Sequence, residues 1–193
     1  MSWISFVKLR VLGGSAGRKK CCDTDSTVGG THSDKLHTMP RVLIIAYGNP
    51  MRSDDGVAWR AAAALEGKSS TLDVEILRAH QLTPELAETI SRSEAVIFVD
   101  AANTGPPGQI SSAEIGPPQT QPRFSHQLSP DAVIALAHQL FGGRPHAFSI
   151  TLTGACFDHG ESLSPAVQAA LPALVARIEA LIQQFLPLEA PPD

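Results

Sequence analysis

The sequence contains little of what several classes of protein require. Its three cysteines, adjacent at Cys21 and Cys22 and isolated at Cys156, allow neither a disulfide framework nor the spacing of a zinc ribbon. No apolar run approaches the roughly 20 residues that a membrane span needs, and a net charge of −4 argues against a nucleic-acid-binding surface. Cysteine use of this kind is typical of a reducing compartment. We therefore expect a cytoplasmic protein that binds neither nucleic acid nor membrane.

Familiar catalytic motifs are also missing from residues 40–193. This stretch has no Gly-x-Ser-x-Gly nucleophile turn and no His-Glu-x-x-His zinc helix. The turn after its first apolar run lacks the Gly-x-Gly-x-x-Gly loop of dinucleotide-binding proteins. A conventional serine hydrolase, a zincin and a dinucleotide-binding protein are therefore disfavoured.

The composition changes near residue 39. Residues 1–39 hold six Lys and Arg and three Asp, a net of +3, so the remaining residues must carry −7 for the total to be −4. The first 38 residues are rich in Gly, Ser, Thr and Lys and lack sustained periodicity. We expect 1–38 to be a disordered or non-native extension, 39–187 a single α/β domain, and 188–193 a frayed tail.

From residue 40 onward, short apolar runs alternate with amphipathic segments. The pattern predicts strands over 41–46, 72–77, 95–99, 109–115 and 147–155. It predicts helices over 54–66, 84–90, 130–140 and 165–185. Such alternation indicates a mostly parallel sheet. We therefore predict a three-layer α/β fold, in which a twisted sheet of about five strands has helices on both faces.

Three predicted helix starts share a Ser or Thr cap followed by proline, at Thr83, Ser129 and Ser164. Two of them belong to a repeated pattern, His-Gln-Leu-Ser/Thr-Pro-acid, which begins at His80 and again at His126. A helix start explains the last four residues of the pattern but not the His-Gln pair. We expect at least one of these histidines to have a further role.

The segment Val42–Gly56 is the most informative part of the chain. A buried strand is predicted to break at Gly48-Asn49-Pro50, and Ser53 is then placed to N-cap a helix. Asp54 and Asp55 would lie in the first turn, where the helix dipole favours negative charge. Open α/β sheets bind ligands beyond the carboxyl ends of their strands, so these acids are predicted to lie where chemistry takes place.

Three side chains are predicted to converge at that edge of the sheet. Asp55 follows the first strand, Asp100 is expected to end the central apolar strand, and His126 precedes a helix. Two carboxylates and an imidazole suit a divalent first-row metal such as nickel or zinc. Their spacing is too wide for a local metal motif, so only the fold can bring them together.

These same positions carry a resemblance to a known family. Gly48–Gly56 resembles the opening Gly-Asn-x-x-x-x-Asp-Asp/Glu signature of the hydrogenase maturation endopeptidases, which trim the large subunit of nickel–iron hydrogenases. Val99-Asp100-Ala101 resembles the second acidic site of that family, and Ser125–Leu128 its histidine motif. The order and the separations agree across residues 41–186.

The resemblance implies a fold, a reaction and a set of site residues. Asp55, Asp100 and His126 would bind nickel and form the catalytic centre, and the metal would be carried by the substrate rather than held permanently. The reaction would remove the C-terminal extension from a nickel–iron hydrogenase large-subunit precursor after nickel insertion. The partner is then that precursor.

Three further residues are candidates for substrate binding, each with a structural alternative. Asn49 can adopt an unusual backbone conformation after Gly48. Arg52 can pair with an acid of the site, a substrate carboxylate or a backbone carbonyl. Asp54 can be a helix-terminal carboxylate or exchange roles with Asp55.

Two other functions remain open at this point. One is a metal-dependent hydrolase of similar fold with a resident zinc ion. The other is a non-catalytic nickel-binding maturation chaperone. Neither is excluded by the residues alone, because each would use the same carboxylates and imidazole.

Overall fold

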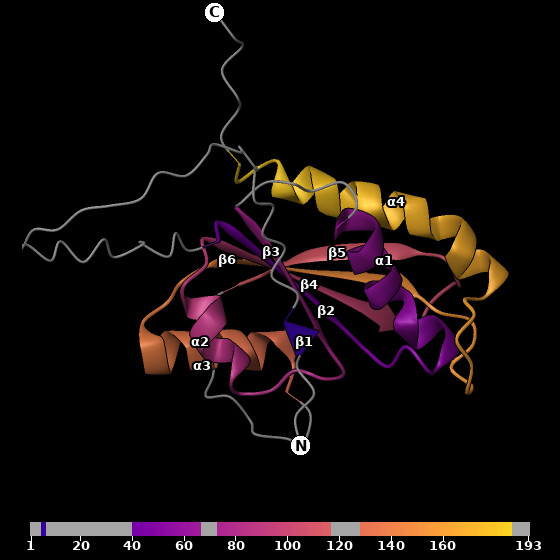
Figure 1. Ribbon diagram of the computed structural model, residues 1–193, viewed down its shortest axis with the longest axis horizontal. Coiled ribbons are helices and arrows are strands. Elements are labelled where there is room, and N and C mark those ends of the chain that lie inside the picture. Colours follow the sequence, from indigo (N-terminus) through magenta and orange to yellow (C-terminus); the bar gives the residue numbers. More distant parts are fainter. Residues whose placement is uncertain (1–4, 7–39, 67–72, 117–127, 187–193) are drawn as a thin grey trace, which may run out of the picture.

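The computed structural model describes residues 5–6, 40–66, 73–116 and 128–186. They form a six-stranded sheet in the order β1-β3-β2-β4-β6-β5 (Figure 1). The strands are β1 (Ser5–Phe6), β2 (Val42–Tyr47), β3 (Val74–Ala79), β4 (Ala95–Ala102), β5 (Ile110–Ile115) and β6 (His146–Thr153). The helices are η1 (Ser53–Gly56), α1 (Val57–Glu66), α2 (Leu86–Ser91), α3 (Pro130–Phe141) and α4 (Pro165–Ile182), of which η1 is a 3-10 turn.

The predicted α/β class is confirmed. Strands β3, β2, β4 and β6 are parallel, and the antiparallel strands β1 and β5 form the two edges of the sheet. The short strand β1 comes from the segment predicted to be an extension. The remainder of 1–39 lies outside the described residues, as does 187–193, so the proposed domain boundaries stay predictions.

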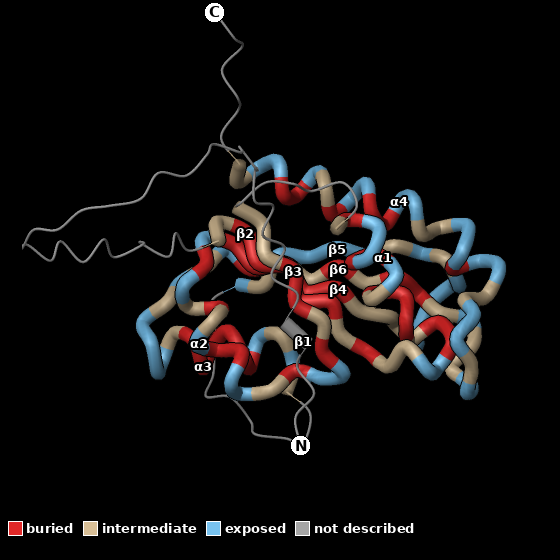
Figure 2. The backbone as a smooth tube through the Cα atoms, in the orientation of Figure 1, coloured by how far each residue is buried: buried red, intermediate tan, exposed pale blue. Residues whose placement is uncertain are grey.

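The central strands form where the sequence has unbroken apolar runs. All of β2 up to Ala46 is buried, and so is β4 from Ala95 to Val99, because helices cover both faces of a parallel sheet. Figure 2 shows these strands in red between the helical layers. The predicted end of the central strand was wrong, however. β4 continues through Asp100 to Ala102, where each residue still pairs with β6.

Two apolar clusters lie on opposite faces of the sheet. Alternate side chains of β2 and β4 pack under α1 and α4, including Ile44 and Ile97. The intervening side chains, including Ile45 and Phe98, pack against α2 and α3. Alternation of this kind follows from the period of two along a strand. Figure 1 shows the resulting three layers, with α1 and α4 on one side and α2 and α3 on the other.

The predicted helices are present, with differences at their ends. α3 and α4 begin at the prolines that follow Ser129 and Ser164, as expected. α2 begins only at Leu86, with Glu85 in the N-cap position, so the predicted cap at Thr83 was wrong. The chain first makes a turn, in which the Leu86 N–H donates to the Thr83 carbonyl at 3.2 Å. α4 ends at Ile182 rather than near 185.

Helix α4 differs from the other described helices in being long and apolar enough to cross a membrane by length and composition. Core helices of globular proteins also pass this test. Its buried residues form one stripe that packs in the cluster beneath α1: Val167, Leu174, Val175, Ile178, Leu181 and Ile182. We therefore interpret α4 as the covering helix of one sheet face.

A candidate carboxylate site at the carboxyl edge of the sheet

The candidate site lies where the parallel strands end. β2 and β4 pair in parallel with Ala46 opposite Val99, so Tyr47 and Asp100 follow at the same level of neighbouring strands. Both belong to the alternate set of positions that faces α2 and α3. Asp55 reaches the same edge from the loop that follows β2. Such an edge is where α/β proteins bind ligands.

The turn after β2 depends on Gly48. Its φ of 133° lies in the region that L-residues avoid, and a Cβ there would lie 2.3 Å from the carbonyl oxygen of Asp55. Asn49 then closes the turn, because its Oδ1 accepts the Met51 N–H at 2.9 Å. Asn49 was expected to adopt an unusual backbone conformation, but the positive φ angles of this turn belong to Gly48 and Ser53, and Asn49 acts through its side chain. Its contact with substrate stays a prediction.

Ser53 does not cap the helix as predicted. Arg52 occupies the N-cap position without a side-chain hydrogen bond, and Ser53 is the first residue of η1. Its φ of 47° is the only positive value among the described non-glycine residues. The Ser53 hydroxyl instead donates to the Asp158 carbonyl at 3.1 Å. The side chain is thus used to attach a distant loop, which the local sequence could not indicate.

Asp54 is a structural carboxylate. It is completely buried, and its oxygens accept N–H groups from Ala155 (2.7 Å), Cys156 (2.9 Å) and Ser164 (2.7 Å). Burial alone would raise the pKa of Asp54, but these backbone hydrogen bonds outweigh it and lower the pKa. A substrate cannot reach a carboxylate enclosed in this way. The predicted substrate-binding role of Asp54 was therefore wrong.

The loop 154–164 was missed by the sequence analysis. Besides Asp54, it is held by Arg52, whose Nε–H donates to the Phe157 carbonyl at 3.2 Å. Two backbone bonds between Met51–Ser53 and Gly160 add to this attachment. Arg52 thus contacts a backbone carbonyl of its own chain, and its contact with substrate stays a prediction. Cys156, in the same loop, is half-buried.

Asp55 and Asp100 lie close enough to interact electrostatically. Both are half-buried. Asp55 Oδ2 accepts the Asn49 N–H at 3.0 Å, and Asp100 Oδ1 accepts its neighbour's N–H, from Ala101, at 2.7 Å. No described contact engages the second oxygen of Asp55. Each carboxylate is thus oriented by a backbone group.

Burial raises the pKa of Asp100 to about 6. Hydrogen bonds from the Ala101 N–H and the Tyr47 hydroxyl act in the opposite direction, and the negative charge of Asp55 raises the pKa further. The pKa of Tyr47 is raised as well, first by burial and then by the charge and hydrogen bonding of Asp100. Tyr47 therefore stays protonated, and its hydroxyl can donate to Asp100.

The third predicted residue, His126, lies outside the described residues. Leu128 packs against the cluster beneath α2 and α3, which is the face that carries Tyr47 and Asp100. Within the described part of the chain, no three His, Cys, Asp or Glu side chains are grouped so that they could hold a metal ion. The role of His126, and metal binding by the two acids, therefore stay predictions.

His80, the other histidine of the repeated pattern, lies directly after β3 at the same edge and is exposed. Its ring contacts Trp59 of α1, with the ring centroids 5.3 Å apart. The Trp59 indole N–H donates to the Ala79 carbonyl at 3.3 Å. His80 therefore lies at the rim of this edge of the sheet.

Comparisons with known proteins bear on the fold. No family model matches the chain, and no curated protein is detectably similar to it in sequence. The structure is similar to the hydrogenase maturating endopeptidase HybD from E. coli, with a TM-score of 0.60 and 21% identity over 75% of this chain and 93% of that one.

Two archaeal structures are similar to a comparable degree. The NiFe hydrogenase maturation protease HybD from Thermococcus kodakarensis has a TM-score of 0.58 and 23% identity, over 73% of this chain and 98% of that one. HycI, a maturation protease from Thermococcus kodakarensis KOD1, has a TM-score of 0.59 and 23% identity, over 74% of this chain and 92% of that one. The chain thus has the fold of these proteases over nearly their whole length.

Proposed function

We propose that this protein is an endopeptidase that removes the C-terminal extension of a nickel–iron hydrogenase large-subunit precursor once nickel has been inserted. The observation that carries the proposal is the proximity of Asp55 and Asp100 at the carboxyl edge of a sheet whose fold is that of hydrogenase maturation proteases. The expected compartment is the cytoplasm, because three cysteines whose spacing allows no disulfide framework fit a reducing environment.

Nickel belongs to the substrate in this proposal. The precursor holds the ion, and Asp55, Asp100 and His126 complete its coordination when the precursor docks. Carboxylate and imidazole are both good ligands for nickel. Only a loaded precursor gains these bonds, so only it binds tightly, and the protease distinguishes the two forms by their difference in binding free energy.

Two routes to peptide hydrolysis fit the described residues. The ion can polarise the scissile carbonyl or an attacking water, or a carboxylate can act as general base towards that water. Asp100 suits the second role, because burial raises its pKa to about 6, near the working pH of a cytoplasmic enzyme. In both routes the backbone N–H groups of Asn49 and Ala101 keep the carboxylates in place.

The test is mass spectrometry of a large-subunit precursor, with and without nickel, before and after incubation with the protein. We expect the nickel-loaded precursor alone to lose a C-terminal peptide. Asp100→Asn should slow this cleavage by about 100-fold, since a lost metal ligand costs several kcal/mol. Asp73→Asn, which changes a carboxylate just before β3 at the opposite edge of the sheet, is the matched control and should process normally.

Three outcomes would contradict the proposal. Undiminished cleavage by Asp100→Asn would remove that residue from the mechanism. Tightly held stoichiometric metal in the purified protein, with cleavage that ignores nickel in the substrate, would favour a resident-zinc hydrolase. A precursor that binds without any change in mass would favour a chaperone.

A further inference from the structure

Large apolar side chains are exposed at two places in the described part of the chain. Leu140 (65% exposed) and Phe141 (49%) end α3, beside the start of β6 and therefore at the amino edge of the sheet. Met51 (42%) lies at the carboxyl edge, in the loop that carries Asp55. Single exposed apolar residues are common and need no explanation. The exposure of Met51 does need an explanation, because hydrogen bonds within its loop hold the residue in a fixed position at the edge that carries Asp55.

The backbone of Met51 is fixed from both sides. Its N–H donates to Asn49 Oδ1 at 2.9 Å, and its carbonyl accepts the Gly160 N–H at 2.9 Å. Ser53, two residues later, has the unfavourable φ of 47°. A Cβ at Gly56 would lie 2.9 Å from the Cα of Pro50, so the loop is also tightly packed. Strain of this kind persists only where the surroundings determine the conformation, and it is frequent at ligand-binding segments.

Arg52 adds a positive charge beside this apolar side chain. It is exposed, and its Nε–H donates to the Phe157 carbonyl at 3.2 Å. That bond fixes one edge of the guanidinium, while the group as a whole stays at the surface. The nearby acids of the site, Asp55 and Asp100, would repel a negatively charged substrate group. Arg52 offers such a group a place at the rim, where it can be paired.

We propose that Met51 and Arg52, the Met51–Arg52 tip, dock the polypeptide of the substrate beside its cleavage site. The tip fits a segment with an apolar side chain next to a carboxylate. Because its backbone is already ordered, little conformational entropy is lost when the substrate binds. The inference rests on the proposed function and deepens it, since the acids would bind the metal whereas the Met51–Arg52 tip would bind the polypeptide of the substrate.

The experiment compares Met51→Ala with Leu140→Ala, an equally conservative truncation of an exposed side chain at the opposite edge. Binding of the large-subunit precursor is measured with and without nickel, together with kcat and KM for processing. Met51→Ala should weaken binding of both precursor forms by about fivefold, as loss of a partly buried apolar contact predicts. KM should rise by a similar factor with kcat unchanged. Leu140→Ala should behave as wild type, and Met51→Leu should restore binding.

A second variant tests the charge. Arg52→Gln should weaken binding of both precursor forms at low salt, and this loss should shrink as salt screens the interaction. Equal behaviour of Met51→Ala and Leu140→Ala would overturn the inference, and so would a loss confined to the nickel-loaded form. A change in oligomeric state with Met51→Ala, at unchanged precursor binding, would assign the tip to self-association and also overturn it. If the wild-type protein cleaves no precursor, the proposed function itself fails.

Discussion

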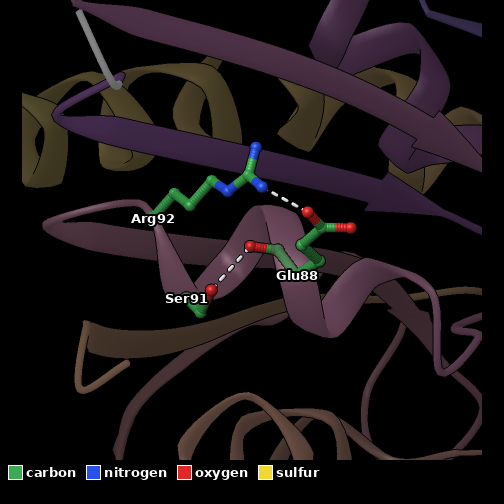
Figure 3. A network of polar contacts seen from close by, with 3 residues as sticks. All are labelled: Glu88, Ser91 and Arg92. Carbon is green, nitrogen blue, oxygen red and sulfur yellow. Dashed lines mark hydrogen bonds and ion pairs between the residues drawn. The ribbon is translucent and has the colours of Figure 1, made fainter. Parts of the chain in front are cut away.

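Two networks around acidic side chains show how differently the same chemistry can be used in this molecule. On α2, Glu88 pairs with Arg92 one turn away, and the Ser91 hydroxyl donates to the Glu88 carbonyl at 2.7 Å (Figure 3). Both charged side chains are 52% exposed. At the carboxyl edge, Asp54 is fully buried and accepts N–H groups from residues more than 100 positions away in the sequence, Ala155, Cys156 and Ser164.

The difference lies in what each network connects. The α2 network joins neighbours within one helix, where the backbone already places them together, and water competes for both charges. The Asp54 network joins two loops that are far apart in the sequence and that also meet through Met51, Arg52 and Ser53. The Asp54 side chain is fully buried, so water does not compete for its hydrogen bonds. Asp54 is therefore the buried part of a larger attachment of the 154–164 loop, whereas α2 would form without its ion pair.

The largest expected effect on stability comes from a substitution at Asp54. Asp54→Asn leaves buried N–H groups facing an amide that cannot accept all of them, and should reduce the free energy of unfolding by about 3 kcal/mol. Chemical denaturation measures this. Hydrogen exchange should show faster exchange in 154–164. Asp158→Asn, an exposed acid in the same loop, is the control and should change stability little. If Asp54→Asn reduced the free energy of unfolding by less than about 1 kcal/mol, the buried Asp54 network would be no more important for stability than an exposed ion pair.

A substitution at Asp100 should change stability in the opposite direction to one at Asp54. Its pKa is raised to about 6 from an ordinary 3.8, mainly by burial, so the folded protein holds this proton more tightly than the unfolded chain. Its contribution to stability is present below pH 4 and is lost as pH rises through 6. Asp100→Asn should therefore be more stable than wild type by about 1–2 kcal/mol at pH 7.

The same measurement at pH 4 supplies the control, because both proteins are then uncharged at position 100. The difference in unfolding free energy between Asp100→Asn and wild type should disappear there. A difference that stays constant from pH 4 to 8 would mean that burial of the charge is not its cause. Stabilisation together with loss of processing would fit a site kept for function at a cost in stability.

Much of the fold could be predicted because it follows from local patterns. The apolar runs of β2 and β4 are too continuous for a half-exposed strand, and prolines after Ser129 and Ser164 do mark the helix starts. The convergence of Asp55 and Asp100 also followed, since parallel strands end at the same edge. The predicted end of β4 at Asp100 was wrong because the strand continues beyond its apolar run. Its last residues, up to Ala102, pair with β6, and the local pattern does not show this pairing.

The roles of Ser53 and Asp54 could not be predicted in the same way. Next to a turn, a serine and an aspartate have the composition of a helix start, which is the structure predicted for them. Their partners come from the 154–164 loop, which arrives through the tertiary fold. The glycines at positions 154 and 160 are a local sign of an irregular loop, but they do not identify its partner.

The smallest expected effect concerns the α2 network. Glu88→Gln removes the ion pair with Arg92 but keeps the helix and the backbone bond to Ser91, so it should reduce stability by less than about 0.5 kcal/mol. Denaturation at low salt and at 1 M salt measures it, and screening should abolish the effect at high salt. Asp54→Asn in the same pair of buffers should keep its full effect, because a buried carboxylate bonded to backbone N–H groups is little screened. If the loss of unfolding free energy in Glu88→Gln persisted in 1 M salt, the Glu88 network would be as insensitive to salt as the Asp54 network, and the proposed difference between them would be wrong.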